Sequence, residues 1–132
     1  METITLAERI QSYVNKALNQ FDHRLPHLKK ETILIAERLT AEITKSMFIN
    51  GKDPRVVAGS IVYLVFRITE ERRKQTDIAL ALDITVPPIR TKYHELLAYI
   101  LEHKKEYERA DIPMARIQKI NNEYYRTIYH NV

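Results

Sequence analysis

Cysteine and tryptophan are absent from this sequence of 132 residues, and glycine occurs only twice. Without cysteine the chain forms neither disulfides nor thiolate metal sites, which suits a reducing cellular interior. The scarcity of glycine, beside many Leu, Ile, Lys and Glu residues, favours an all-α protein. A chain of this length is expected to form one domain that buries roughly two thirds of its unfolded surface.

Signals for secretion or membrane insertion are also missing. The amino terminus, METITLAERI, carries an acidic residue at position 2 and no long apolar run, so we expect no secretory signal. The formal net charge is +4, from 21 basic and 17 acidic residues. This mild excess permits an anionic partner without requiring one.

One stretch, DPRVVAGSIVYLVFR over Asp53–Arg67, has no polar face at any period between its two arginines. Such a segment is enclosed on all sides, and it is too short to cross a bilayer. Its Val and Ile content leaves a buried strand as the competing interpretation. Asp53 as N-cap and Pro54 at the first helical position favour a helix, which we expect to be the centre of the fold.

Amphipathic helices are predicted around this centre by residues that recur at helical spacing. The first begins near Leu6 and ends near residues 22–26. A longer one covers 28–49, with Met47 and Phe48 on its inner face, and Gly51 then suits a left-handed C′ position. A charged break at 70–74 precedes a short helix over 75–82, a turn over 83–85, and a helix from about Pro87 to Leu101. After the charged segment 102–109, Asp111-Ile112-Pro113 starts a last helix, with Ile117, Ile120, Tyr124 and Ile128 inward. We therefore expect a domain over 1–105 and an extension helix over 106–132.

A short helix, a tight turn and a longer helix with polar residues at its start are typical of a helix-turn-helix. In such units the start of the second helix meets base edges in the major groove. Arg90 is the best candidate for reading a base, because its planar fork matches the two acceptors of guanine. The other candidates on the second helix are Thr85, Val86, Thr91 and His94, with Lys92 towards the backbone. Arg72, Arg73 and Lys74 precede the first helix, where phosphates usually lie.

Three local patterns give this region a family resemblance. They are GKDPRVVAGSIVY over 51–63, ERRKQTDIA over 71–79 and ITVPPIRTKYHEL over 84–96. In this order and spacing they resemble the second cyclin-like repeat of transcription factor IIB and of its archaeal counterpart, transcription factor B. The resemblance is specific over 51–97, looser over 4–50 and absent beyond about residue 105.

The resemblance implies a single five-helix cyclin-like domain with the Asp53 helix as its buried centre. It also implies that the helix-turn-helix, over Gln75–Leu97, reads a promoter element in double-stranded DNA. On this basis Arg90 falls on a base-contacting arginine of the family, Pro87 on a position that often holds a base-contacting valine, and Arg72, Arg73 and Lys74 on its basic lead-in. The implied partners are TATA-binding protein or another part of the transcription machinery, and the implied location is the nucleoid of the cytoplasm, or the nucleus in a eukaryote.

Three departures limit what the resemblance carries over. The family has two repeats and a zinc ribbon, whereas we find one repeat here and no cysteine, so we expect no polymerase recruitment through such a ribbon. A homodimer could replace the missing repeat. Pro87-Pro88 removes two backbone donors from the start of the recognition helix. If that helix began at Val86, Thr85 would have no amide to cap, so we expect Pro87 to be the first helical residue. The helix over Ile112–Val132 is additional to the family's fold. Three roles stay open for it: to cover the core, to contact a partner, or to pack on the same helix of a second copy.

Other chemistry-bearing residues have plainer explanations. His23 and His27 lack an evident third ligand, so we expect no metal, and nothing in the sequence calls for a cofactor. His94 is either a DNA contact or a solvated helix residue, and Tyr124, Tyr125 and Tyr129 are better explained as packing residues than as a stacking platform. No nucleophile with its base, phosphate-cradling loop or carboxylate pair is evident, so we expect no catalysis.

Two hypotheses remain open from the sequence. The first is a transcription factor IIB-like protein that binds duplex DNA and acts in transcription initiation or its regulation. The second is a cyclin-like protein-interaction module without direct DNA binding. The low net charge, with Glu70, Glu71, Asp77 and Asp83 near the predicted DNA face, supports the second. An exposed apolar groove between the first two helices would favour it further.

Overall fold

The computed structural model describes residues 3–130, with side chains as far as Arg126, and all of its regular elements are helical. This confirms the predicted all-α class. The elements are α1 (Leu6–Asp22), α2 (Lys30–Lys45), a 3₁₀ turn η1 (Met47–Ile49), α3 (Pro54–Ile68), α4 (Gln75–Leu82), α5 (Val86–Glu102), α6 (Lys104–Arg109) and α7 (Met114–His130). No helix within these residues is both long and apolar enough to cross a membrane.

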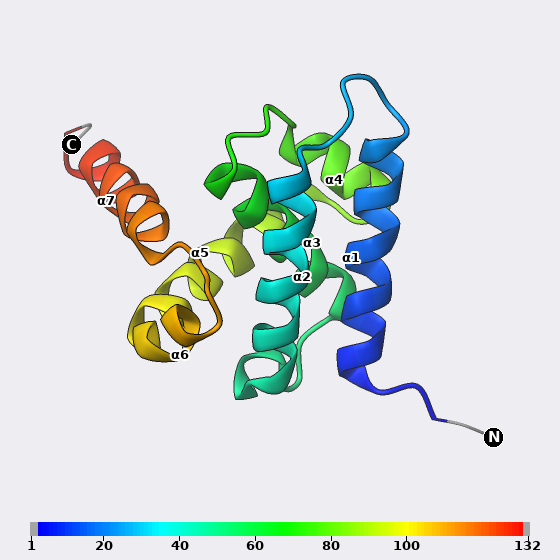
Figure 1. Cartoon of the computed structure of the whole chain (residues 1–132), viewed down its shortest axis with the longest axis horizontal. Helices are drawn as coiled ribbons and strands as arrows, with labels where there is room; N and C mark the ends of the chain where they lie inside the picture. Colours follow the sequence, from blue (N-terminus) through cyan, green and yellow to red (C-terminus); the bar gives the residue numbers. More distant parts are fainter. Residues whose placement is uncertain (1–2, 131–132) are drawn as a thin grey trace.

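Helix α3 is the buried centre of the molecule. Of the residues from Val56 to Phe66, all are buried except the half-buried Tyr63. Asp53 caps its start by accepting a hydrogen bond from the amide of Arg55 at 2.9 Å, and Pro54 occupies the first helical position. Helices α1, α2, α4 and α5 all pack on α3 (Figure 1). The helical interpretation of this stretch is confirmed, and the competing strand was wrong.

Helices α3 and α5 approach each other closely at Gly59. A Cβ atom at this position would lie 3.1 Å from Cγ1 of Ile89 and 3.4 Å from Cδ1 of Leu82. Its neighbour Ser60 is fully buried, and its hydroxyl donates to the carbonyl of Val56 at 2.8 Å. The small residues in the middle of α3 therefore let α5 and the end of α4 seat directly on the core helix.

The end of the second predicted helix differs from the expectation. Helix α2 stops at Lys45, and η1 follows as a separate turn whose start is capped by Ser46. This change of direction leaves Met47 80% exposed while Phe48 and Ile49 are buried, so the inward placement of Met47 was wrong. Helical spacing does not carry across the break. Gly51 has φ of 73°, in agreement with its predicted left-handed conformation.

The carboxy-terminal third contains one more helix than predicted. The charged segment after α5 forms α6, and this short helix buries Tyr107, which is 1% exposed. Helix α7 begins at Met114, slightly later than expected, and its Ile117 and Ile120 are buried as predicted. Tyr124 is half-buried, and the side chain of Ile128 lies outside the described residues. The hydrophobic core continues through Tyr107 to Ile120, across the predicted domain boundary at residue 105.

Helix α7 occupies the edge of the molecule. It lies at the opposite end from α1 and projects away from the other helices towards its carboxy terminus (Figure 1). It packs mainly on α3, α5 and α6, and its Arg116 also pairs with Glu31 of α2 at 2.6 Å. The extra helix therefore covers part of the core formed by the preceding helices, which is one of the three roles that the sequence left open.

Candidate nucleic-acid interface

Helices α4 and α5 are joined by a three-residue turn whose shape is held by the backbone. Asp83 adopts the left-handed conformation with φ of 55°, and the amide of Ile84 returns to the carbonyl of Ala79 at 3.0 Å. This is the usual hydrogen bonding of a left-handed helix end. From α3, Arg55 donates to the carbonyl of Asp83 at 3.3 Å. The core helix thus fixes the turn that places the start of α5.

The start of α5 is open to solvent. Thr85 is exposed and extended, and it makes no side-chain capping bond, as expected from the two prolines that follow. The helix begins at Val86 rather than at Pro87, so the predicted start was one residue late. Val86 packs partly against the core, whereas Pro87 is exposed and its carbonyl accepts a hydrogen bond from the hydroxyl of Thr91 at 3.2 Å.

Arg90 projects from the exposed face of α5, one turn after this start. Its Nη2 lies 3.5 Å from Oε1 of Gln75, the first residue of α4. A separation of this length is a weak hydrogen bond at most. Gln75 therefore orients Arg90 without forming a strong hydrogen bond to it, and the planar guanidinium of Arg90 can still donate to a ligand.

The basic residues predicted to contact phosphate fall into two groups. Arg72 and Lys74 are exposed, and neither side chain has a polar or charged partner among the described residues. Arg73 is turned inward: its guanidinium donates to the carbonyl of Pro26 and lies 5.7 Å from the centre of the Phe21 ring. Lys92 is paired with Glu95 at 2.9 Å. Two of the basic residues predicted for this surface, Arg73 and Lys92, therefore already have internal partners.

His94 is covered by the extra helix. Its ring lies 4.1 Å from that of Tyr124 on α7, with 31° between the planes, and 5.1 Å from that of Tyr93. Its Nδ1 is buried and has no hydrogen-bond partner among the described residues. Burial, and then the charge of Arg90, lower the pKa of His94 below its ordinary value of 6.5. We infer that His94 supports the contact with α7 and does not meet DNA.

Sequence reasoning missed the residues that α7 brings to this surface. Glu123 forms an ion pair with Arg67 of α3 at 3.8 Å, and with Tyr124 it lines a hollow that also contains Gln75 and Arg90. No local pattern links residues 123–124 to the helix-turn-helix region. The only local signal was the helical spacing of Ile117, Ile120 and Tyr124. It indicated that α7 has a buried face, but not which helices that face contacts.

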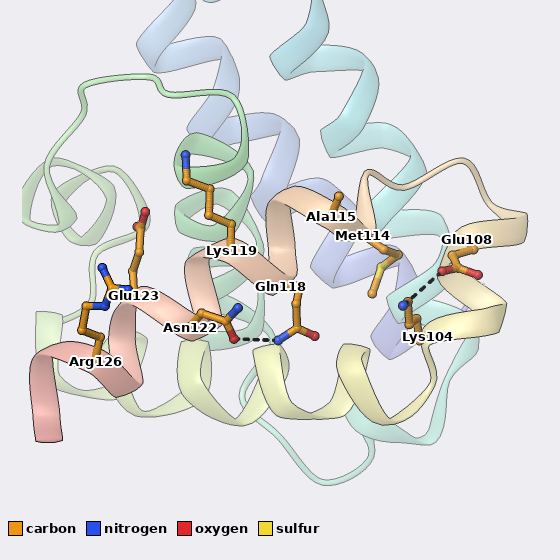
Figure 2. Close-up of a pocket in the computed structure, with 9 residues that line it drawn as sticks. All are labelled: Lys104, Glu108, Met114, Ala115, Gln118, Lys119, Asn122, Glu123 and Arg126. Carbon is orange, nitrogen blue, oxygen red and sulfur yellow. Dashed lines mark hydrogen bonds and ion pairs between the residues drawn. The ribbon is translucent and has the colours of Figure 1, made fainter.

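A second hollow, of about 670 Å³, lies between α6 and α7 and shares only Glu123 with the hollow beside Arg90 (Figure 2). Its polar side chains are largely satisfied by one another. Lys104 pairs with Glu108 at 3.7 Å, and Gln118 donates to Asn122 at 2.9 Å. These groups do not converge on a common point as a reacting centre requires. Among the described residues, no three His, Asp or Glu side chains gather closely enough to hold a metal ion.

Comparison with known proteins supports the resemblance seen in the sequence. A family model described as the transcription factor TFIIB repeat matches residues 10–99, which is more than half of the chain. The matched part runs from α1 into α5 and includes the turn between α4 and α5. No curated protein matches the chain, and neither does any solved structure.

Proposed function

The chain belongs to the transcription factor TFIIB repeat family, and from this premise we propose that it binds duplex DNA through α4 and the start of α5. The family makes it a transcription-related cyclin-like domain. In the proposed complex, α4, the turn and α5 act as a helix-turn-helix, and the first turns of α5 enter the major groove. The observation that carries the proposal is the exposure of Arg90 and its freedom from any strong internal contact.

The proposed contacts follow from which side chains are free. Arg72 and Lys74 contact phosphates and supply most of the affinity, because neutralising phosphates releases counterions whatever the base sequence. Arg90 supplies discrimination by donating two hydrogen bonds to a guanine edge. Thr85, Pro87 and Thr91 are exposed beside it and complete the surface that meets the groove. Arg73 and Lys92 act indirectly, since each already has an internal partner.

We propose that DNA binding serves transcription initiation or its regulation, in the nucleoid or the nucleus, with TATA-binding protein or another component of the machinery as partner. A homodimer would bring two copies of the α4–α5 surface onto one duplex. Two half-sites about one helical turn apart would then be the expected target.

A fluorescence anisotropy titration tests DNA binding directly. The full chain is titrated at low salt into a pool of random duplexes, and the bound fraction is sequenced to find a preferred site. Arg90→Ala is expected to cost about 1–3 kcal/mol on that site and to flatten the sequence preference. Arg9→Ala, which removes the same charge from the exposed face of α1, is the matched control and should change affinity little. Absence of duplex binding at low salt would contradict the proposal.

Lys74→Ala separates the phosphate contacts from base reading. Because a phosphate contact is blind to sequence, this variant should weaken binding to all duplexes alike. The slope of log K against log salt should fall by about one unit. A loss confined to the preferred site would show that Lys74 has been assigned to the wrong contact.

A second candidate function is a protein-docking module without DNA binding, and one observation favours it. A hollow of about 230 Å³ lies between α1 and α2, with Val14, Leu18 and Ala36 among its apolar lining residues. The hydroxyl of Thr40, also in the lining, is buried and has no hydrogen-bond partner among the described residues. A chain that fails to bind duplex but binds a component of the transcription machinery, with loss of that binding in Asn15→Arg at an exposed lining residue, would favour this candidate.

A further inference from the structure

A cavity of about 330 Å³ opens where α7 crosses α3 and α5, next to the first residue of α4. Its size is at the lower end of the range of about 300–1,000 Å³ that is typical of small-molecule sites. The lining combines two guanidinium groups, an amide, one carboxylate and several aromatic rings. Its lining side chains include Arg67, Arg90, Gln75, Glu123, His94 and Tyr124.

The aromatic lining is continuous across three helices. Tyr63 of α3 meets Tyr93 of α5 edge to face at 4.7 Å, Tyr93 meets His94, and His94 meets Tyr124 of α7. Tyr63, His94 and Tyr124 are half-buried, so they present part of their rings to the cavity. Rings held in this way offer a planar ligand a preformed stacking surface.

The charged lining has an excess of positive charge. Glu123 is paired with Arg67, whereas the side-chain partner of Arg90 is the neutral amide of Gln75 at 3.5 Å. Two guanidinium groups therefore face one carboxylate. Guanidinium groups bind phosphate and carboxylate through paired, planar hydrogen bonds and also stack on aromatic faces. The site thus favours a ligand that carries both a ring and a negative charge.

We propose that this cavity binds a planar aromatic anion of the size of a nucleoside monophosphate, with its charge on Arg67 and Arg90 and its ring against Tyr124 and His94. The site is additional to the DNA-binding surface, but it shares Arg90 with it. Occupancy of the cavity therefore withdraws Arg90 from the duplex. The ligand and DNA must weaken each other by the same factor, because coupling between two binding sites is reciprocal. This competition, unlike ligand binding itself, rests on the proposed function.

Isothermal titration calorimetry on the full chain without DNA tests the site, with AMP as the probe. Adenosine presents the ring without the charge, and inorganic phosphate presents the charge without the ring. AMP is expected to bind at least about tenfold more tightly than either, since it alone gains both the charge-assisted hydrogen bonds and the stacking. No binding of AMP at about 10 mM would overturn the proposal. Equal binding of AMP and phosphate would reduce the site to an anion contact and overturn the role of the rings.

Two variants with matched controls locate the binding. Arg67→Gln removes a guanidinium that lines the cavity and is expected to weaken AMP binding by at least about tenfold. Arg116→Gln is its control, because it breaks another surface ion pair of α7, with Glu31 at 2.6 Å, outside this cavity. Tyr124→Leu should weaken AMP binding without affecting phosphate, and Tyr125→Leu, at a 48% exposed neighbour outside the lining, is its control. Equal losses in a variant and its control would overturn the assignment.

The competition is tested by repeating the duplex titration in the presence of saturating AMP. Duplex affinity is expected to fall by about 5–150-fold, which is the effect assigned to Arg90 itself. Unchanged duplex affinity with AMP bound would overturn the sharing of Arg90. The calorimetric titrations use no DNA, so they decide the ligand site even if the chain binds no duplex. In the same way, duplex binding without AMP binding would overturn only the ligand site.

Discussion

Helices α3 and α5 begin alike in sequence and differently in structure. Each start has a polar residue followed closely by proline, Asp53-Pro54 in one and Thr85-Val86-Pro87 in the other. Asp53 accepts a hydrogen bond from an amide of α3, and the helix that follows it is buried on all sides. Thr85 makes no such bond, and the first turn of α5 leaves Pro87, Pro88 and Arg90 exposed.

This comparison separates the parts of the molecule that maintain the fold from those available for binding. Every side chain in the middle of α3 has neighbours on all sides, so a change there alters packing. The exposed side chains at the start of α5 contribute little to packing and are free to meet a ligand. Ile89 connects the two regions, since it is fully buried against Gly59 while its neighbour Arg90 is exposed.

The largest effect is expected where burial is complete. Leu64→Ala in α3, at a position that is 0% exposed, should lower the free energy of unfolding by about 2–5 kcal/mol. The same substitution at Leu80, which is 75% exposed on α4, should change it by less than about 0.5 kcal/mol. Urea unfolding followed by circular dichroism measures both. Similar values for the two variants would contradict the contrast between core and surface.

An intermediate effect is expected at the two helix starts. Asp53→Ala removes a capping bond and should cost about 1 kcal/mol of stability. Thr85→Ala removes a side chain that caps nothing, so we expect a change of only a few tenths of a kcal/mol. The same unfolding measurement distinguishes them. A cost at Thr85 equal to that at Asp53 would mean that α5 is capped in solution by a bond that this structure does not contain.

The smallest effect concerns His94, whose pKa is lowered in the folded chain, mainly by burial and then by Arg90. Because the unfolded chain binds this proton more readily, the stability that His94 contributes is present at neutral pH. It is lost as the pH falls through about 6.5 towards the folded pKa. The parent should therefore lose more stability than His94→Gln between about pH 8 and pH 5. Equal losses in urea titrations at the two pH values would contradict the buried placement of the ring.

Several elements could be predicted because the signals for them are local. The bounds of α3 follow from Asp53, Pro54 and an apolar run with no polar face, and α1 follows from the spacing between Leu6 and Phe21. Helix α6 and the outward turn of Met47 could not be predicted in the same way. Both depend on how the chain changes direction between helices, which helical spacing does not describe.

The candidate interface was predictable in position but not in detail. The pattern of short helix, turn and longer helix identified the surface that carries Arg90, and the structure leaves that side chain exposed. It does not leave Arg73 or Lys92 free in the same way. The partner of Arg73 is the carbonyl of Pro26, 47 positions away in the chain, and nothing near Arg73 in the sequence indicates it.

The sequence alone determined that this chain is helical and that the Asp53–Arg67 segment is its centre, because eleven successive residues without a polar face can be removed from water only in the interior. Only the tertiary structure decided which polar side chains remain available at the surface. A hydrogen bond, an ion pair or a ring contact depends on positions in space. In this way Pro26 engages Arg73 and Tyr124 covers His94, while Arg90 is left facing solvent.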